Sequence, residues 1–476
     1  MDRSLQVLFI SAEVAPFAKR GGLGDVAGAL PKALRALGHD VRVVMPAYAN
    51  IEAGYPGVNG TDIILQVPTG SGPVRAGVFE GALPGSDVPV YFIAERNLFN
   101  RPEVYGYWDD PYRFAFLSRA ALDLVAALNW RPDLLHAHDW HAAPAVTWLA
   151  TSGQTFDFFR GIPSLFTIHN LAHQGLTSWN IFDYLGIRTH SLLEERYGEV
   201  NFMARGIYHA TQINTVSPSY AREILSREGG ANMDGLLRHR QRDLHGILNG
   251  IDTDVWNPAT DKHLSFPYDQ HNLAGKAQNK RALQRLLGLP ERDDVPLLAM
   301  VSRLDFQKGL DILGEPLHLL LNGMAGEAQF VVLGTGAAEY EDMFRHLAHY
   351  HKEKMTAVLA YSGGLAPQIY AGSDMFLMPS RFEPCGLGQM IAMRYGSVPI
   401  VRATGGLADT VSEGHTGFLF YPMDSYALWQ AIQRAMYIYY HDKTSWRQMQ
   451  INGMSSDFSW TRFAQSYQQL YEWTTR

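Results

Sequence analysis

Short apolar runs alternate with helical patterns twice along this chain of 476 residues. Residues 7–10 and 41–45 have the continuous apolar character of strands that are buried on both faces of a parallel sheet. The same alternation starts again at residues 296–301, after a polar, turn-rich stretch. Such an alternation places helices on both faces of a mostly parallel sheet. Two alternations therefore predict two Rossmann-like, doubly wound α/β domains.

The turn-rich stretch begins near Leu248 and predicts the domain boundary there. It divides the chain into an N-terminal domain of residues 1–247 and a C-terminal domain of residues 248–456. In the remaining tail, residues 457–476, apolar side chains recur at near-helical spacing and predict an amphipathic helix. Ligands of open α/β sheets bind outside the carboxyl ends of the strands. With two such domains, we expect the ligand in the cleft between them.

The composition excludes several classes of protein. Lys and Arg number 40 and Asp and Glu number 47, a net charge of −7, which weighs against a nucleic-acid-binding protein. Cys385 is the single cysteine, so an internal disulfide is excluded and a reducing compartment is expected. No apolar run approaches the roughly 18 residues of a membrane span, and no secretory signal is recognisable. These features predict a soluble protein of the cytoplasm.

Two glycine-containing segments follow predicted strands. Residues 19–25 combine a lysine with backbone N–H groups at a helix N-terminus, a geometry that suits phosphate. A simple connecting turn is an equally good interpretation, because the match to GxGxxG is incomplete. Residues 334–336 lack the third glycine of that motif. A dinucleotide-binding oxidoreductase is therefore disfavoured.

Two further segments have the composition of metal sites. His136, His138 and His141 cluster around a strand end, but no fourth ligand stands at helical spacing from them. Contacts to a substrate are the better interpretation. Asp252 and Asp254 could hold a divalent cation on a diphosphate, but they lie in a turn-rich segment, and turn chemistry explains them well.

Charged residues follow two strands of the second domain. Arg303 and Lys308 come after residues 296–301 and are positioned for a diphosphate, although solvated surface charge is a close alternative. The loop of residues 379–388 joins a strand to a helix and carries Glu383. This carboxylate could bond sugar hydroxyls while the helix N-terminus takes a phosphate. The Cys385 thiol itself is best explained as a small buried hydrophobe.

Together these motifs resemble the bacterial glycogen synthases and plant starch synthases, the glucan synthases of glycosyltransferase family 5. The resemblance covers nearly the whole chain in the order of the family. The motifs that carry it are residues 19–26 (KRGGLGDV), 136–141 (HAHDWH), 167–171 (TIHNL), 249–252 (NGID), 302–304 (SRL), 307–309 (QKG), 379–387 (PSRFEPCGL) and 404–410 (TGGLADT).

The resemblance implies the GT-B architecture, with two Rossmann-like domains around a cleft and a C-terminal helix that crosses back to the first. It implies transfer of glucose from a nucleoside diphosphate glucose, usually ADP-glucose, to the non-reducing 4-OH of an α-1,4-glucan, with retention of configuration. The acceptor would be glycogen, a starch-like polymer or a maltooligosaccharide, and no metal or other cofactor is expected. The location would be the bacterial cytoplasm, or the plastid stroma for a mature plant form.

The resemblance also implies roles for single residues. Arg303 and Lys308 would hold the diphosphate, and Tyr361 would stack on the base. The residues expected to act in catalysis are His169, Arg303, Lys308, Glu383 and Asp139, the last of these near the acceptor. The residues expected to bind the nucleotide sugar are Lys19, Gly21, Gly22, Asp25, Asn249, Tyr361, Cys385, Gly386, Leu387, Thr404, Gly405 and Gly406, among which Asp25 supports the Lys19 loop.

Three positions depart from the patterns of these transferases. Arg20 replaces a small residue, and Gly388 stands where many members have threonine or asparagine. Ile391 occupies the place of a second glutamate found in wider families of this fold, an absence that is common in family 5. A synthase that uses UDP-glucose and a catalytically impaired glucan-binding homologue therefore stay open as alternatives. For the active enzyme, front-face attack is favoured over a covalent intermediate, because no pair of carboxylates is recognisable.

Overall fold

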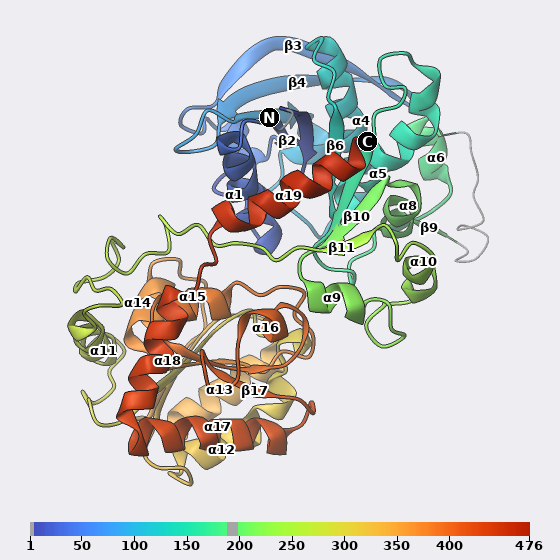
Figure 1. The fold of residues 1–476 in the computed structure, drawn as a ribbon. Coiled ribbons are helices and arrows are strands. Elements are labelled where there is room, and N and C mark those ends of the chain that lie inside the picture. Colours follow the sequence, from blue (N-terminus) through green and yellow to red (C-terminus); the bar gives the residue numbers. More distant parts are fainter. Residues whose placement is uncertain (1–3, 188–198) are drawn as a thin grey trace. The chain divides into compact units, whose positions relative to one another are not determined.

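The computed structural model describes residues 4–187 and 199–476. The chain divides into two compact units (Figure 1). The first unit comprises Met1–Asn249 together with Trp460–Arg476, and the second comprises Gly250–Ser459. The terminal helix, α19 (Trp460–Thr474), thus belongs to the same unit as the first half of the chain.

The first unit contains a sheet with the strand order β11-β10-β7-β6-β1-β2-β5-β4-β3 in the described ranges. Its strands are β1 (Gln6–Ile10), β2 (Asp40–Pro46), β3 (Asn59–Thr69), β4 (Gly72–Ala82), β5 (Pro89–Ala94), β6 (Leu134–His138), β7 (Ser164–Ile168), β10 (Gln212–Thr215) and β11 (Leu244–Gly246). All pairings are parallel except those of β4, which is antiparallel to both β3 and β5. The β3–β4 hairpin was not predicted from the sequence, because half of its side chains face solvent and no continuous apolar run marks it.

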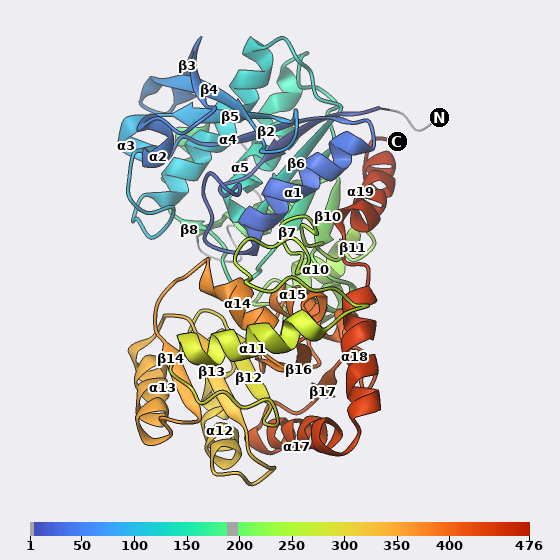
Figure 2. The ribbon, with the colours of Figure 1, turned by 90° about the vertical axis from the view of Figure 1, so that its left-hand side faces the viewer.

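Helices cover both faces of this sheet. On β1, Phe9 packs into the core beneath α1 (Gly22–Ala36) and α19, which lie side by side in Figures 1 and 2. Leu8 points to the opposite face and packs with α4 (Asp110–Ala127), α5 (Asp139–Ala150) and α8 (Phe202–His209). Shorter elements complete the unit: α2 (Ala49–Glu52), α3 (Arg96–Phe99), α6 (Asn180–Leu185), α9 (Pro218–Glu223), α10 (Asp234–His239), β8 (Leu176–Thr177) and β9 (Val200–Asn201).

The second unit contains an entirely parallel sheet with the order β14-β13-β12-β15-β16-β17. Its strands are β12 (Leu297–Val301), β13 (Gln329–Leu333), β14 (Met355–Val358), β15 (Met375–Met378), β16 (Val398–Arg402) and β17 (Phe418–Phe420). Its helices are α11 (Ala274–Leu286), α12 (Gly314–Leu321), α13 (Ala338–Tyr350), α14 (Leu365–Gly372), α15 (Gly388–Arg394), α16 (Gly405–Thr410), α17 (Ser425–His441) and α18 (Lys443–Ser455).

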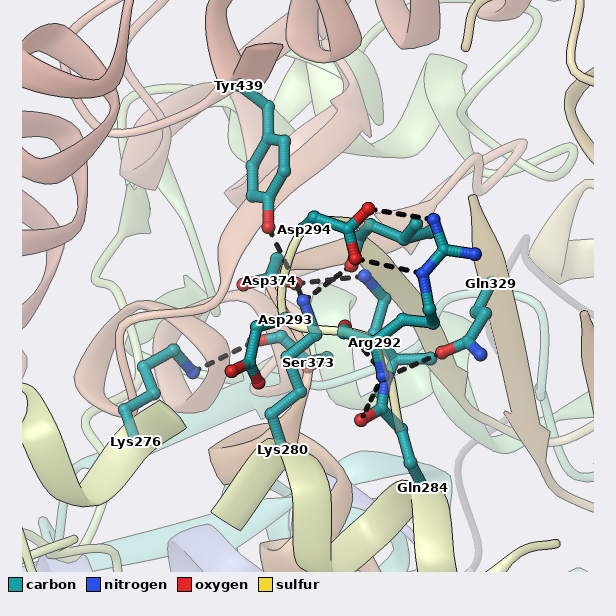
Figure 3. Close-up of polar contacts among 12 residues, drawn as sticks. Lys276, Lys280, Gln284, Arg292, Asp293, Asp294, Gln329, Ser373, Asp374 and Tyr439 are labelled. Carbon is teal, nitrogen blue, oxygen red and sulfur yellow. Dashed lines mark hydrogen bonds and ion pairs between the residues drawn. The ribbon is translucent and has the colours of Figure 1, made fainter. Parts of the chain in front are cut away.

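Helix α11 lies in the segment that the sequence analysis described only as polar and turn-rich. Lys276, Lys280 and Gln284 stand four residues apart on its buried face (Figure 3). The Lys276 ammonium donates to the carbonyl of Ser373 at 2.8 Å, and Lys280 lies 2.7 Å from the Asp374 carboxylate. The buried face of the helix is therefore polar, and its ammonium groups bond to residues directly before β15. For this reason the sequence of α11 lacks the apolar periodicity that predicts a helix.

The predicted fold class is confirmed, since both units are α/β with mostly parallel sheets. In the described part of the chain, no helix has the length and apolar character needed to cross a membrane.

Candidate active site

Both sheets have a topological switch point, which is a position at which successive strands are added in opposite directions. In the first unit, β2 and β6 flank β1, and in the second, β13 and β15 flank β12. The loops that leave the carboxyl ends of the two diverging strands open a crevice, where α/β proteins bind their ligands. These loops carry the Lys19 segment and Asp139 in the first unit, and Lys308 and Glu383 in the second.

A buried glutamate organises the loop after β1. Glu13 Oε2 accepts hydrogen bonds from the backbone N–H groups of Arg20 and Gly21, at 2.5 and 2.9 Å. Its other oxygen accepts one from the Tyr105 hydroxyl at 2.7 Å. Neither Glu13 nor Tyr105 was predicted from the sequence; a carboxylate in an apolar segment directly after the first strand was the available signal for Glu13.

The same loop presents open backbone at the start of α1. A Cβ built on Gly21 or Gly22 would meet no atom within 4 Å. The Lys19 ammonium lies 2.7 Å from the Asp25 carboxylate, which ties the loop to the first turn of the helix. Burial raises the pKa of Asp25, and the Lys19 charge opposes this shift. Asp25 and Lys19 therefore form an ion pair within this loop.

Asp139 begins α5 at the carboxyl end of β6, with a left-handed φ of +55°. Its Oδ1 accepts a hydrogen bond from the backbone N–H of His169 at 2.7 Å, so it positions the loop after β7. Burial raises the pKa of Asp139 to about 7, although the hydrogen bonds from His169 and Asn170 act in the opposite direction. Asp139 and His169 are therefore brought together, as neighbouring strands require.

Three buried histidines form a connected row. His136 Nδ1 lies 2.7 Å from the Tyr471 hydroxyl and its Nε2 lies 2.8 Å from Thr167 Oγ1, so both nitrogens are engaged. His138 Nδ1 lies 2.9 Å from His169 Nε2. Burial lowers the pKa of all three rings, that of His169 to about 3, so they are neutral at physiological pH.

The partners of His138 decide where the protons of this row lie. Its Nε2 is buried and has no hydrogen-bond partner among the described residues. A proton there would be an orphaned buried donor, which is more costly than an unused acceptor, so the proton belongs on Nδ1. His169 Nε2 must then accept, and the His169 proton lies on Nδ1. The row thus leaves His169 Nδ1 as an N–H donor.

The buried Asp139 carboxyl makes stability depend on pH. Its pKa is about 7 in the folded protein, above the ordinary 3.8, so the folded state retains a proton that the unfolded state loses. Stability that is fully present below pH 3.8 is therefore lost progressively as the pH rises from 3.8 to about 7, by at most about 1.4 kcal/mol per pH unit, and this loss is complete above pH 7. We expect wild type to lose more of its Tm than Asp139→Asn between pH 5 and 8. Parallel Tm profiles for the two proteins would contradict this assignment.

In the second unit, the loops after β12 and β15 meet through a partly buried ion pair. Lys308 Nζ lies 2.6 Å from Glu383 Oε2, which also accepts a hydrogen bond from Ser380 Oγ at 3.0 Å. Arg303, from the start of the same β12 loop, is more exposed and lies 2.9 Å from the Asp305 carboxylate. The structure therefore places a partly buried lysine, a buried carboxylate and a solvent-facing arginine at the second switch point.

Glycines bring the loop after β16 onto the loop after β15. A Cβ on Gly405 would lie 1.9 Å from the Glu383 carbonyl oxygen, and one on Gly406 would lie 2.2 Å from the Cys385 carbonyl oxygen. The Gly406 N–H donates to the Glu383 carbonyl at 3.1 Å. Only glycine permits this approach. Consequently Thr404, Gly405 and Gly406 lie against the segment that holds Glu383, Cys385, Gly386 and Leu387.

Two expected binding residues lie outside these contacts. Tyr361 follows β14 at the edge of the sheet, and its side chain is 87% exposed. Asn249 is buried at the end of the first unit, and its Oδ1 has no hydrogen-bond partner among the described residues. Neither residue is joined by a hydrogen bond to the groups described above, within the part of the chain that the structure describes.

The departures from the family pattern have structural explanations. The Arg20 side chain forms an ion pair with Glu103, and only the Arg20 backbone N–H bonds to the Glu13 carboxylate. A Cβ on Gly388 would lie 3.3 Å from both Met378 Sδ and the Phe376 ring, so a side chain there would press on the packing of α15 against β15. Ile391 is buried on α15.

Local structure explains the Asp252 and Asp254 pair and the glycines at residues 334 and 336. Asp252 Oδ1 accepts hydrogen bonds from the N–H groups of Asp254 and Val255, the turn chemistry that the sequence predicted. A Cβ on Gly334 would lie 1.9 Å from the Ser302 carbonyl, and one on Gly336 would lie 2.2 Å from that of Leu304. These two glycines therefore serve close backbone packing.

The comparisons with known proteins agree with this arrangement. Residues 6–239 match the family described as the starch synthase catalytic domain, and residues 288–448 match glycosyl transferases group 1. Two parallel-sheet units with these matches define a glycosyltransferase of the GT-B architecture.

Individual relatives extend the match over the whole chain. The glycogen synthase of Moorella thermoacetica is 44% identical over 99% of this chain and 97% of its own length. The glycogen synthase of Geotalea daltonii is 45% identical over 98% of each chain. The catalytic domain of starch synthase IV from Arabidopsis thaliana, bound to ADP and acarbose, matches with a TM-score of 0.92 and 34% identity, covering 99% of this chain and 100% of that one. The chain belongs to the glycogen and starch synthase family.

Proposed function

We propose that this chain transfers glucose from ADP-glucose to the non-reducing 4-OH of an α-1,4-glucan, with retention of configuration. Membership of the glycogen and starch synthase family supports the reaction class. The related starch synthase IV domain was solved with ADP and acarbose, which supports an adenine nucleotide and a sugar chain as ligands. The observation that carries the proposal is the Lys308–Glu383 pair at the switch point of the second unit.

In this mechanism the second unit binds the donor. The leaving group is a nucleoside diphosphate, which is already anionic and needs stabilisation of charge more than a proton. Lys308 and Arg303 supply positive charge, and the backbone N–H groups of the glycine loops supply fixed dipoles. Charges fixed before the reaction need no reorganisation when the glycosidic bond breaks. Tyr361 stacks on the base, which its exposed ring permits.

Glu383 orients the glucose in this scheme. Its carboxylate is held by Lys308 and Ser380, so it is a fixed acceptor for sugar hydroxyls rather than a free nucleophile. Retention then follows from front-face attack, in which the acceptor oxygen bonds to the anomeric carbon as the bond to the phosphate oxygen breaks. The departing phosphate oxygen takes the proton of the acceptor hydroxyl. No metal ion is needed for this step.

The first unit contributes the Lys19 loop, Asp139 and His169. Lys19 and the open backbone of Gly21 and Gly22 suit an anion or sugar oxygens. The His169 ring donates from Nδ1 to a sugar hydroxyl, because the hydrogen bond with His138 occupies Nε2. Asp139 holds the His169 segment, and we assign it to the acceptor side.

Donor use can be tested directly with the intact protein. We expect labelled glucose to pass from ADP-glucose to glycogen or maltoheptaose, at a rate unchanged by EDTA and at least tenfold above that from UDP-glucose. Incorporation from UDP-glucose alone would keep the reaction class and overturn the donor. No incorporation from either donor, by folded protein that still binds glucan, would favour a binding homologue. Loss of activity in EDTA would contradict the metal-independent mechanism.

A further inference from the structure

A groove of about 330 Å³ lies on the first unit, beside the edge strand β11. One wall is the outer face of α19 and the other is the segment from His245 to Leu248 with Pro218. Its floor includes the buried side chains of Phe463 and Leu470. The groove is formed by the first unit alone, and it lies outside the loops of the candidate active site.

The polar rim of this groove comes mainly from one face of α19. Arg462, Ser466, Gln469 and Trp473 recur at helical spacing, and all four are exposed. The Trp473 side chain is 50% exposed, and its indole centroid lies 5.7 Å from that of the His245 ring. None of the residues that line the groove is acidic. The rim thus combines a half-exposed aromatic ring with an amide and a hydroxyl.

Helix α19 is held rigidly beneath this face. The Tyr471 hydroxyl is hydrogen-bonded to His136 on β6, and the Tyr467 hydroxyl accepts from Asn214 on β10, at 2.7 and 3.0 Å. The exposed ring and amide are therefore mounted on a fixed element. A ligand that binds there would lose little free energy to ordering of the protein.

We propose that this groove binds a short stretch of α-1,4-glucan, as a second glucan site distinct from the candidate active site. A sugar ring presents apolar C–H faces and a rim of hydroxyls, which match an exposed indole flanked by amide and hydroxyl groups. The groove lies at the small end of the usual range for ligand pockets, which suits about two glucose units. Because the occupant is the acceptor polymer, the inference rests on the proposed function.

The charge of the lining favours this occupant over a nucleotide. A glucan is uncharged, and apart from Arg462 the side chains of the rim are neutral polar or aromatic groups. A diphosphate is typically bound by several cations or by a glycine loop at a helix N-terminus. Here Arg462 is the single lysine or arginine among the residues that line the groove. A site on the outer surface would hold a long polymer near the enzyme and raise its effective concentration.

The test compares Trp473→Ala with Trp473→Phe, which keeps an aromatic ring, and with Gln465→Ala, an exposed residue of α19 outside the groove. Apparent affinity for glycogen is measured by retardation in native gels containing glycogen. We expect Trp473→Ala to weaken binding at least fivefold, Trp473→Phe to retain most of it, and Gln465→Ala to behave as wild type. The kcat with ADP-glucose and maltotriose should be unchanged in Trp473→Ala, while KM for glycogen rises.

Wild-type retardation of Trp473→Ala would overturn the proposal. So would a loss of ADP binding with no change for glycogen, which would assign the groove to a nucleotide. The gel measurement needs no turnover, so it decides the groove even if the protein transfers glucose from neither donor. A failure of the proposed function and a failure of this inference are thus separate results.

Discussion

Replacing Lys308 by alanine is expected to lower kcat at least about 100-fold, which is the usual effect of removing one fixed donor of transition-state charge stabilisation. Lys308 is a partly buried cation of the second switch point, and its ammonium lies 2.6 Å from the buried Glu383 carboxylate. The substitution removes positive charge from the diphosphate and leaves the buried Glu383 carboxylate without its ion-pair partner. The loss should therefore appear in kcat and also as a lower Tm.

Two measurements, made also on two further variants, separate these two effects. Steady-state kinetics with ADP-glucose give kcat, and thermal unfolding gives the change in Tm. Glu383→Gln in the Lys308→Ala background removes the unpaired charge, so it should recover Tm without recovering kcat. Lys354→Ala is the matched control, because Lys354 forms a partly exposed ion pair with Glu327, 3.1 Å away in the same unit, and such pairs contribute little. An unchanged kcat in Lys308→Ala would refute the role given to this lysine.

Replacing Gly405 by alanine is expected to have the second large effect. The new Cβ would lie 1.9 Å from the Glu383 carbonyl oxygen, far inside van der Waals contact, and φ is +47°. Since the obstacle is backbone and not a flexible side chain, the loops after β15 and β16 must separate. The Gly406 N–H would lose its bond to Glu383, and the carboxylate of Glu383 would shift from its position beside Lys308. Displacements of about 1 Å can lower rates about 100-fold.

Gly414→Ala controls for backbone conformation alone. Gly414 also has a left-handed φ, +69°, but a Cβ there would meet no atom within 4 Å. We expect Gly405→Ala to lower kcat at least tenfold and to reduce Tm, whereas Gly414→Ala should lower Tm slightly and leave kcat unchanged. If the two variants lose kcat equally, the close approach of the loops is not what matters. Kinetics with ADP-glucose and thermal unfolding of both variants provide the comparison.

Local sequence patterns predicted the elements whose environment is uniform. The strands at residues 7–10 and 296–301 are buried on both faces, so a continuous apolar run marks them without reference to the rest of the chain. The start of α9 likewise depends on neighbouring residues, because Ser217 Oγ accepts a hydrogen bond from the Tyr220 N–H at 3.1 Å. Helix α11 was not predicted, because its buried face is formed by lysines and a glutamine whose partners lie elsewhere in the chain.

By itself, the sequence determined the two parallel α/β units, the family, and the loops that carry chemical groups, since each depends on neighbouring residues or on a short motif. Only the tertiary structure decided which groups meet. Lys308 and Glu383 are 75 positions apart, and Tyr471 and His136 are 335 apart. The groove beside Trp473 likewise joins the end of the chain to residues near position 245. Such contacts depend on strand order and helix packing, and the sequence around each side chain does not predict which distant side chain it will contact.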